Sequence, residues 1–262
     1  MIKAKDVIGI VFCVAVATAP AMAAENILLT RPGFEVGAQV SSYHYEEPAF
    51  AKTTGHRQGV DGAFTFRTRE TWYGKADVRY SYGKLRYEGS GTKDSVPDTL
   101  FEARFVEGKD FLPGAKIGLS PYGGFGYRYL YDDIRGTTST GAVGYRRYSN
   151  YLYIPLGLTM RAGFGEGGVI VPTIEYDLFL HGRQKSKLSD TGLGYSDADN
   201  NQDKGYGYRA SLMFEHGHFA FGPWMNYWKI KDSDTVAIGG GFYGMEPANW
   251  TREIGFEVKY KF

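Results

Sequence analysis

The chain has 262 residues, including 21 Tyr, 17 Phe and 36 Gly, and its 30 basic and 29 acidic side chains give a net charge of +1. Because there is no basic surplus, the charge argues against a protein that binds nucleic acid. After the first 23 residues no segment approaches the about 18 uninterrupted apolar residues of a transmembrane helix, which excludes a helical membrane protein. Abundant aromatic residues and glycines are instead typical of strands with aromatic girdles, joined by tight turns.

The first 23 residues have the pattern of a secretory signal peptide. Lys3 and Lys5 precede an apolar run over residues 7–19, and the sequence Ala-Met-Ala then supplies a small-residue cleavage site. We expect cleavage after Ala23 and one mature domain over residues 24–262. An uncleaved membrane anchor is the alternative, but the run is shorter than the ~20 apolar residues that a spanning helix needs.

The mature chain is expected to be free of thiols and close to neutral. Cys13, the only cysteine, lies within the signal peptide. Neither a disulfide nor a cysteine metal site is therefore available to the mature protein. Lys3, Lys5 and Asp6 give the signal peptide a charge of +1, which accounts for the net charge of the whole chain.

Apolar and polar residues alternate with a period of two in about ten later segments, which is the pattern of β-strands whose two faces meet different media. In the first of these segments Phe34, Val36 and Val40 share one face, while polar residues occupy the other. Residues 219–230 are aromatic on both faces, so the orientation of that strand stays open. The expected strands, in chain order, lie in residues 34–45, 59–69, 74–87, 101–105, 117–131, 151–161, 170–180, 205–215, 219–230 and 251–262.

The connections between these segments alternate in length. Short ones read "ETWYG", "GKDFLPG", "GFGEGG" and "HGH". Long polar ones cover residues 46–58, 89–98, 132–147, 183–204 and 231–249. This alternation predicts an all-β fold, an antiparallel up-and-down transmembrane barrel with short turns at one end and long loops at the other. About ten strands are expected, with eight or twelve as alternatives, and closure of the sheet would leave no unpaired edge in lipid.

The last expected strand places Ile254, Phe256, Val258, Tyr260 and Phe262 at alternate positions, opposite a charged face. With the signal peptide and the alternating segments, this strand resembles that of the small bacterial outer-membrane β-barrel proteins, the OmpA-, OmpX- and OmpW-like group. The resemblance implies a Gram-negative outer-membrane location, contact with outer-membrane lipid and lipopolysaccharide, and insertion by the barrel-assembly machinery, for which these five residues would be the signal. OmpA-like barrels commonly have about eight strands, fewer than expected here.

Charged residues recur on the faces opposite the apolar ones, and in a barrel they would line the lumen. If they pair with each other, the interior is filled by an ion-pair network; left partly unpaired, they would line a narrow polar channel. The sequence leaves both possibilities open, because distances between strands depend on register. The predicted lumenal charges are Glu35, Arg67, Arg69, Asp77, Arg79, Glu102, Arg104, Arg128, Arg161, Glu175, Asp177, Arg209, Glu253 and Glu257.

Two groups of histidines are candidates for chemistry. His181 follows Asp177 by four residues on one expected strand and so would share its face, where a carboxylate could orient an imidazole as a general base. No G-x-S-x-G motif accompanies the pair. His216 and His218 stand beside Glu215 in a short turn, a set that could bind a metal. In both cases a solvated rim or turn is the favoured interpretation.

The segment "SDADNNQDKG" places Asp197, Asp199, Asn201 and Asp203 at alternate positions, like the opening of a calcium-binding loop. It lacks the glycine of the sixth position and the glutamate of the twelfth, where Tyr208 stands. A solvated acidic loop is favoured, and weak calcium binding is the alternative.

We therefore expect a single-domain, non-enzymatic outer-membrane barrel with no cofactor and no catalytic or metal site. Its expected role is that of a structural or surface-interaction barrel that acts through its extracellular loops. A narrow porin-like channel for small solutes is the first alternative, and an outer-membrane barrel hydrolase is a more distant one. The ligand, the surface partner and the oligomeric state are not determined by the sequence.

Overall fold

The computed structural model describes residues 26–262, so the predicted signal peptide lies outside the described residues. Ten long antiparallel strands form a closed barrel, in which each pairs with the next and β10 pairs with β8. In chain order they are β1 (Gly33–Glu47), β2 (Ala51–Arg67), β3 (Trp72–Gly89), β4 (Gly91–Lys109), β6 (Ile117–Thr137), β7 (Val143–Phe164), β8 (Gly168–Ser186), β10 (Gly205–His216), β11 (Phe219–Ile230) and β14 (Asn249–Lys261). The predicted fold class is confirmed, and the strand number is ten.

Short elements decorate the two ends. β5 (Phe111–Gly114) pairs with β6 near the short turns, and β9 (Ala198–Gln202) extends along β8 in the loop region. β12 (Thr235–Gly239) and β13 (Phe242–Met245) form a separate hairpin between β11 and β14. The single-turn helix η1 is Leu188–Thr191. Within residues 26–262 no helix is long and apolar enough to cross a membrane.

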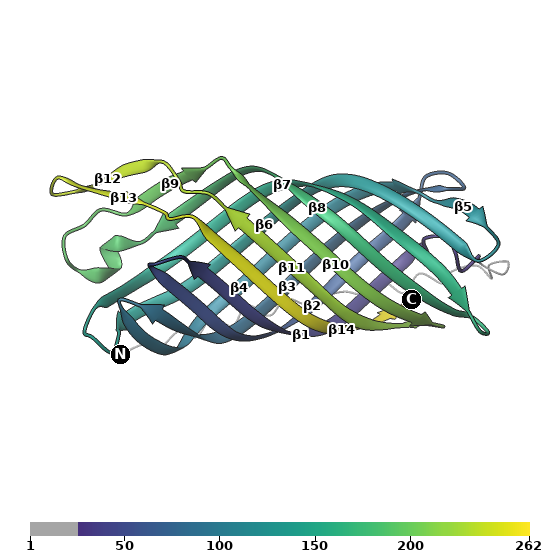
Figure 1. The fold of residues 1–262 in the computed structure, drawn as a ribbon, viewed down its shortest axis with the longest axis horizontal. Coiled ribbons are helices and arrows are strands. Elements are labelled where there is room, and N and C mark those ends of the chain that lie inside the picture. The colour runs from purple at the N-terminus through teal and green to yellow at the C-terminus, as the bar shows by residue number, and fades with distance from the viewer. Residues whose placement is uncertain (1–25) are drawn as a thin grey trace, which may run out of the picture.

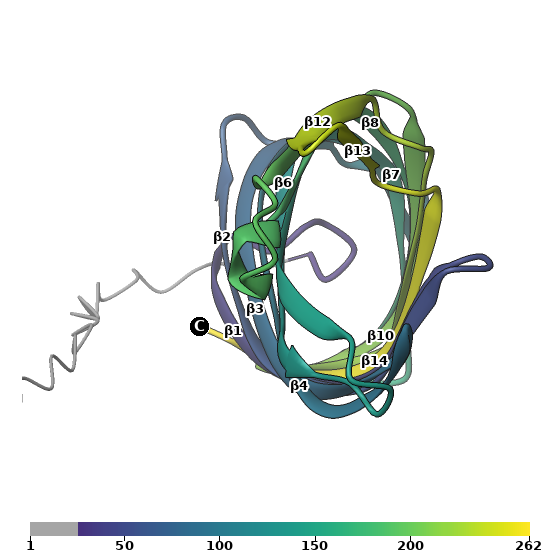
Figure 2. The ribbon, with the colours of Figure 1, turned by 90° about the vertical axis from the view of Figure 1, so that its left-hand side faces the viewer.

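The barrel is elongated, and its two ends differ (Figure 1). The C-terminus and the short turns lie at one end, while β9 and the β12–β13 hairpin project from the other, on the left of the figure. We call the latter the loop end. Viewed from that end, the strands form an oval ring (Figure 2). β14 closes the ring between β1 and β11, since Val258 opposes Ala38 on one side and Phe221 on the other.

Three of the five predicted long loops are in fact mostly strand. Only residues 48–50 separate β1 from β2, Ser90 alone separates β3 from β4, and residues 138–142 separate β6 from β7. β7 has 22 residues, about twice the ~9–11 that a membrane-crossing strand needs. The barrel wall therefore continues toward the loop end. The prediction failed there because both faces of that wall carry polar residues, which removes the period-two signal.

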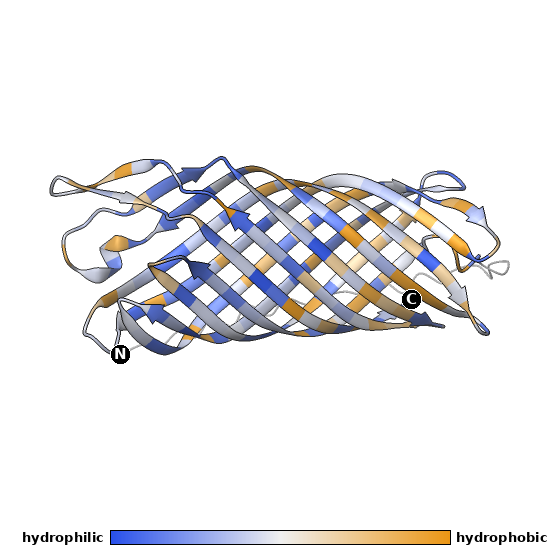
Figure 3. Cartoon of the chain, viewed as in Figure 1, coloured by the Kyte–Doolittle hydropathy of each residue, from blue (hydrophilic) through white to orange (hydrophobic). Residues whose placement is uncertain are grey.

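Apolar and polar residues alternate along the strands (Figure 3), and many of the apolar side chains are exposed, so that they form a belt on the outer face of the barrel. Val40 on β1 is 62% exposed and Val258 on β14 is 47% exposed. The orientation of β11 is now determined: Phe221 and Met225 face outward, while Trp228 is buried in the lumen. Pleating alone produces this division, because successive side chains of a strand point to opposite faces.

Candidate functional site

An arginine of β10 joins opposite walls of the barrel. Arg209 donates from Nη1 to Glu102 Oε2 at 2.7 Å and from Nε to Asp177 Oδ2 at 2.8 Å. Its Nε also lies 3.0 Å from Glu175 Oε1, and its Nη2 donates to the Tyr153 hydroxyl at 2.9 Å. Glu102 is on β4, four strands from β10 around the ring, so these contacts cross the lumen. We call this set of five residues the central network.

A second ion-pair cluster surrounds Glu253 on β14. Its carboxylate accepts a hydrogen bond from the Ser41 hydroxyl at 2.7 Å and forms an ion pair with Arg79 of β3. Arg57 of β2 lies 3.9 Å from the same carboxylate and forms an ion pair with Asp98 of β4. Buried charges are costly unless they are paired. In these two clusters the charged groups of the lumen are paired with groups of opposite charge.

An aromatic and aliphatic layer fills the lumen on the loop-end side of the central network. The indole ring of Trp228 lies 5.0 Å from the ring of Tyr153 in an edge-to-face arrangement, and Trp228 is only 1% exposed. The Arg128 guanidinium stacks over the same indole at 5.4 Å. The layer consists of Leu100, Leu130, Tyr151, Tyr153, Phe179, Trp228 and Ile230. These residues come from β4, β6, β7, β8 and β11, and none is more than 6% exposed, so the layer fills this side of the bore.

A third set of contacts joins opposite walls of the barrel, at the mouth of the lumen on the loop end. Arg147 of β7 lies 2.7 Å, through Nη2, from Glu47 Oε1 at the end of β1, and it also pairs with Glu246, which follows β13. The Tyr45 hydroxyl donates to Glu47 at 2.6 Å and to Glu246 at 3.2 Å. β7 and β1 lie diametrically opposite, five strands apart in either direction. We call these four residues the mouth clamp. It also ties the loop of β12 and β13 to the wall.

Burial raises the pKa of Glu246 to about 7, although Arg147 opposes this shift and the neighbouring Glu47 carboxylate adds to it. A raised carboxyl pKa means that the folded state binds the proton more tightly than the unfolded state does. The free energy of unfolding should therefore fall as the pH rises from about 4.5 to about 7, by on the order of 1 to 3 kcal/mol from this group.

We expect Glu246→Gln to remove this component of the pH dependence, as measured by chemical unfolding of the detergent-solubilised protein at several pH values. Glu166→Gln is the control, because Glu166 is exposed in the turn between β7 and β8. Identical pH profiles for the wild type and Glu246→Gln would contradict the raised pKa.

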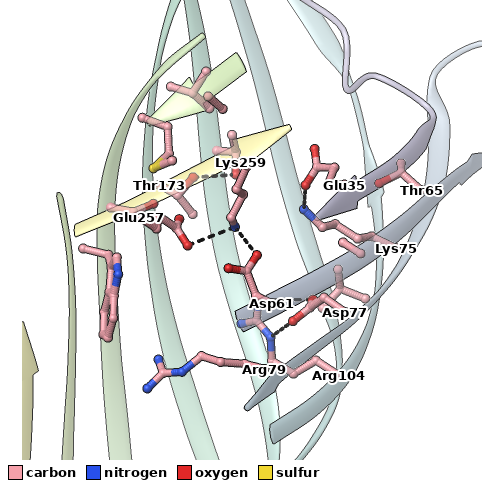
Figure 4. Close-up of a pocket in the computed structure, with 18 of the residues that line it drawn as sticks. Glu35, Asp61, Thr65, Lys75, Asp77, Arg79, Arg104, Thr173, Glu257 and Lys259 are labelled. Carbon is pink, nitrogen blue, oxygen red and sulfur yellow. Dashed lines mark hydrogen bonds and ion pairs between the residues drawn. The ribbon is translucent and has the colours of Figure 1, made fainter. Parts of the chain in front are cut away.

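A polar cavity of about 260 Å³ lies in the lumen on the other side of the central network. Lys259 Nζ stands 3.2 Å from both Asp61 Oδ2 and Glu257 Oε2, and Lys75 Nζ stands 3.2 Å from Glu35 Oε2 (Figure 4). The wall of the cavity thus carries ion-paired charges of both signs. A space of this size and polarity accommodates several water molecules.

The segment before β1 covers the lumen at the end that carries the short turns. Leu28 is buried, and the Ile27 carbonyl accepts a hydrogen bond from Arg161 Nε at 2.9 Å. The Thr30 hydroxyl donates to Asp110 Oδ1 at 2.7 Å. Figure 2 shows this purple segment inside the ring of strands. The chain therefore covers its own lumen below the cavity.

The structure places the predicted lumenal charges on the inner face of the wall, with one exception. Arg69 lies exposed in the turn between β2 and β3, because β2 ends at Arg67. The sequence reasoning missed Arg57, Asp98 and the charged residues of the mouth clamp, all of which fell in segments predicted as loops. It also left out Lys259, which the period-two pattern of β14 could have identified.

His181 and Asp177 do not share a face, so the predicted pair is wrong. Against β7, the register of β8 skips Leu180, which is the extra residue of a β-bulge. The bulge turns His181 to the outer face, where its Nδ1 lies 3.2 Å from Asp203 Oδ1. Asp177 stays buried in the central network. A bulge reverses the parity of every later residue, which the sequence pattern did not reveal.

The other histidines do not converge on a metal site. Glu215 points into the lumen and pairs with Arg161, while its neighbour His216 is exposed. The His218 ring stacks on Tyr260 with centroids 5.4 Å apart. Across residues 26–262 no group of three or more His, Cys, Asp or Glu side chains is placed to hold a metal ion.

The acidic segment around β9 is divided among separate cations. Asp197 pairs with Lys187, and Asp199 Oδ1 accepts a hydrogen bond from Arg183 Nε at 2.6 Å. Asp203 faces His181. Each carboxylate thus has its own partner, and the segment does not gather its oxygens around one point as a calcium loop does.

No family model and no curated protein matches the chain. Among solved structures, the outer membrane protease OmpT from Escherichia coli matches with a TM-score of 0.54 at 10% identity, covering 88% of this chain and 97% of that one. The translocator domain of the autotransporter NalP from Neisseria meningitidis matches with a TM-score of 0.41 at 15% identity, covering 89% and 90%. Ail of Yersinia pestis matches with a TM-score of 0.34 at 9% identity, covering 88% and 100%.

At these identities the likeness concerns the fold alone. The fold is that of the small outer-membrane β-barrels, so the resemblance of the sequence to that group is confirmed at the level of architecture.

Proposed function

We propose that this protein is an integral β-barrel of the bacterial outer membrane that neither conducts solutes nor catalyses a reaction, and that it acts through its loop end and outer surface. The filled lumen carries this proposal. The central network and the aromatic layer join opposite walls, and the mouth clamp joins them again. Charges that are bound to each other support the wall instead of lining a path for solutes.

The outer apolar belt supports the membrane location. Exposed side chains such as Val40, Phe125 and Ile174 lie on different strands around the ring. A soluble monomer rarely exposes so much contiguous apolar surface. In a bilayer the same belt is buried in lipid, and the closed ring leaves no backbone edge unpaired.

The last strand supports insertion by the barrel-assembly machinery. Ile254, Phe256, Val258 and Tyr260 all face outward from β14, and the exposed Phe262 follows them. Until β14 closes the ring against β1, the continuous apolar face of this C-terminal strand is available to a partner. We propose that this face is the insertion signal.

The outermost loops at the loop end support a role in interaction with other molecules at the cell surface. In the β12–β13 hairpin Phe242 and Tyr243 are exposed, and Leu193 is exposed in the preceding loop. The rings of Phe242 and Tyr195 pack edge to face with centroids 5.8 Å apart, which joins the two segments. Large apolar side chains at the far end of the loops, away from the belt, suit contact with another macromolecule.

Single-channel recording in a planar bilayer tests the closed lumen. We expect no conductance steps from the refolded mature chain, once heat-modifiable gel migration has shown that it is folded. Stable steps from the folded wild type would contradict the proposal.

A narrow channel remains the second candidate, because the 260 Å³ cavity already opens part of the lumen. Buried donors without hydrogen-bond partners line it, namely Gln39 Nε2, Arg79 Nε and Trp224 Nε1. Wild-type conductance would select this function. A barrel hydrolase would instead require peptide or ester cleavage by the folded wild type.

A further inference from the structure

Four side chains that line the 260 Å³ cavity each carry a buried polar atom without a hydrogen-bond partner among residues 26–262. Three of these atoms are donors: Gln39 Nε2 of β1, Arg79 Nε of β3 and Trp224 Nε1 of β11. The fourth is an acceptor, Asp61 Oδ1 of β2. Gln39 is only 6% exposed and Trp224 only 7%. A buried polar group without a partner is costly, so four of them in one cavity indicate a ligand that supplies the missing partners. We call these four residues the cavity cluster.

The cavity cluster occupies one sector of the barrel wall. Arg79 opposes Asp61 in the register of β3 and β2, and Gln39 is a diagonal neighbour of Asp61 because it opposes Gly59. Opposed side chains of a sheet have Cβ atoms about 4.5–5.5 Å apart, and diagonal ones about 7–8 Å. The Arg79 guanidinium lies 4.5 Å from the centre of the Trp224 ring. The four groups are therefore close enough to contact one small molecule.

Two glycines of the wall leave space at the cavity cluster. A Cβ added at Gly37 of β1 would stand 2.5 Å from Asp61 Oδ1, the acceptor without a partner. A Cβ added at Gly255 of β14 would stand 2.5 Å from the indole ring of Trp224. Any larger residue at Gly37 would cover the acceptor, and any larger residue at Gly255 would push the indole away from the wall. Glycine at both positions keeps the cluster open to the cavity.

The charges of the cavity cluster are already paired through their other atoms. Arg79 Nη2 forms an ion pair with Glu253, and Asp61 Oδ2 lies 3.2 Å from Lys259 Nζ. Arg79 Nε and Asp61 Oδ1 therefore remain for a ligand. Donors from three strands suit a carboxylate, because its two oxygens together accept about four hydrogen bonds. The acceptor of Asp61 requires a donor on the same ligand.

We propose that the lumenal cavity binds a small carboxylic acid that carries a hydroxyl or ammonium group on the carbon next to its carboxylate. The carboxylate accepts hydrogen bonds from Gln39, Arg79 and Trp224, and the hydroxyl or ammonium group donates to Asp61. The cavity volume of about 260 Å³ is several times the ~30 Å³ that one water molecule occupies in the liquid. It therefore holds a molecule of a few non-hydrogen atoms.

The ligand enters at the end of the barrel that carries the short turns. The central network and the aromatic layer fill the lumen on the loop-end side of the cavity. On the other side Thr30 and Arg31, from the segment before β1, line the cavity. In an outer-membrane barrel the short turns face the periplasm. The side of entry rests on the proposed membrane location, whereas the site itself does not.

Isothermal titration calorimetry of the folded protein in detergent micelles, at constant ionic strength, tests the site. Glycolate and glycine are the probes, and the tighter of the two identifies the donor group. Gln39→Leu and Trp224→Phe each remove one donor, and the second keeps an aromatic ring on the wall. The control is Trp228→Phe, which removes the same indole N–H from the aromatic layer. We expect the apparent Kd of the tighter probe to rise at least tenfold in each variant and less than threefold in the control.

Acetate, which lacks the donor group, and ethylene glycol, which lacks the carboxylate, are the comparison ligands. We expect both to bind at least tenfold more weakly than the tighter probe. A folded wild type that binds neither probe would mean that the cavity holds only water, and the proposal would be overturned. Acetate that binds as tightly as the probes, or equal Kd values for the wild type and both variants, would also overturn it. The assay uses micelles, so its result is independent of bilayer conductance, which tests the proposed function.

Discussion

Replacing Arg209 with leucine is expected to lower the free energy of unfolding by about 3–5 kcal/mol, the cost of breaking a buried ion pair by removing one partner. Arg209 is the common partner of Glu102, Glu175 and Asp177. Without it these three carboxylates stay in the lumen with less positive charge to balance them. Urea unfolding in lipid vesicles, followed by tryptophan fluorescence, measures the change.

The matched control is Arg183→Leu, which also removes an arginine from an ion pair. The side chain of Arg183 is 60% exposed, so water replaces the lost contact with Asp199 and the effect should be much smaller. An Arg209→Leu variant as stable as this control would show that the lumen is hydrated enough to screen the central network. The filled-lumen proposal would then lose its basis.

Replacing Val258 with arginine is expected to cost about 2–4 kcal/mol, because it would place a charge in the middle of the lipid-facing belt. Val258 lies between Ala38 and Phe221 on the neighbouring strands and points outward. Unfolding in vesicles measures the change, and the loss should be larger there than in short-chain detergent.

Thr173→Arg is the control for this substitution. Thr173 lines the polar cavity, whose wall carries charges of both signs, so the same new side chain would lie among polar groups instead of lipid. Its cost should be clearly lower than that of Val258→Arg. Equal costs at the two positions would mean that the outer face is not in contact with lipid.

The ion pairs inside this barrel contribute more to selecting one register of the strands than to the free energy of unfolding. Buried ion pairs often contribute little net free energy, because desolvation cancels most of their attraction. However, any strand register in which these charged groups do not meet is destabilised, because the groups are then buried without a partner. Arg209 reaches β4 and Arg147 reaches β1, so a slip of one strand would leave several charges unpaired. The polar lumen thereby favours one alignment of the ten strands.

The sequence by itself determined the alternation of the lipid-facing part of most strands, and with it the closed barrel. In β14 the positions of Ile254, Phe256 and Val258 were sufficient, because side chains of a strand alternate strictly and each face meets one medium. The same alternation correctly predicts that Glu253 and Glu257 point into the lumen. Information of this kind is local, since it depends only on the spacing of residues along one strand.

Only the tertiary structure decided which charges meet, where strands end and which way His181 points. Arg147 and Glu47 are separated by a hundred residues and meet only because β7 and β1 are opposite in the ring. The bulge at Leu180 and the polar extensions of the wall leave no periodic signal in the sequence. Register and closure are properties of the whole sheet, so no single strand encodes them.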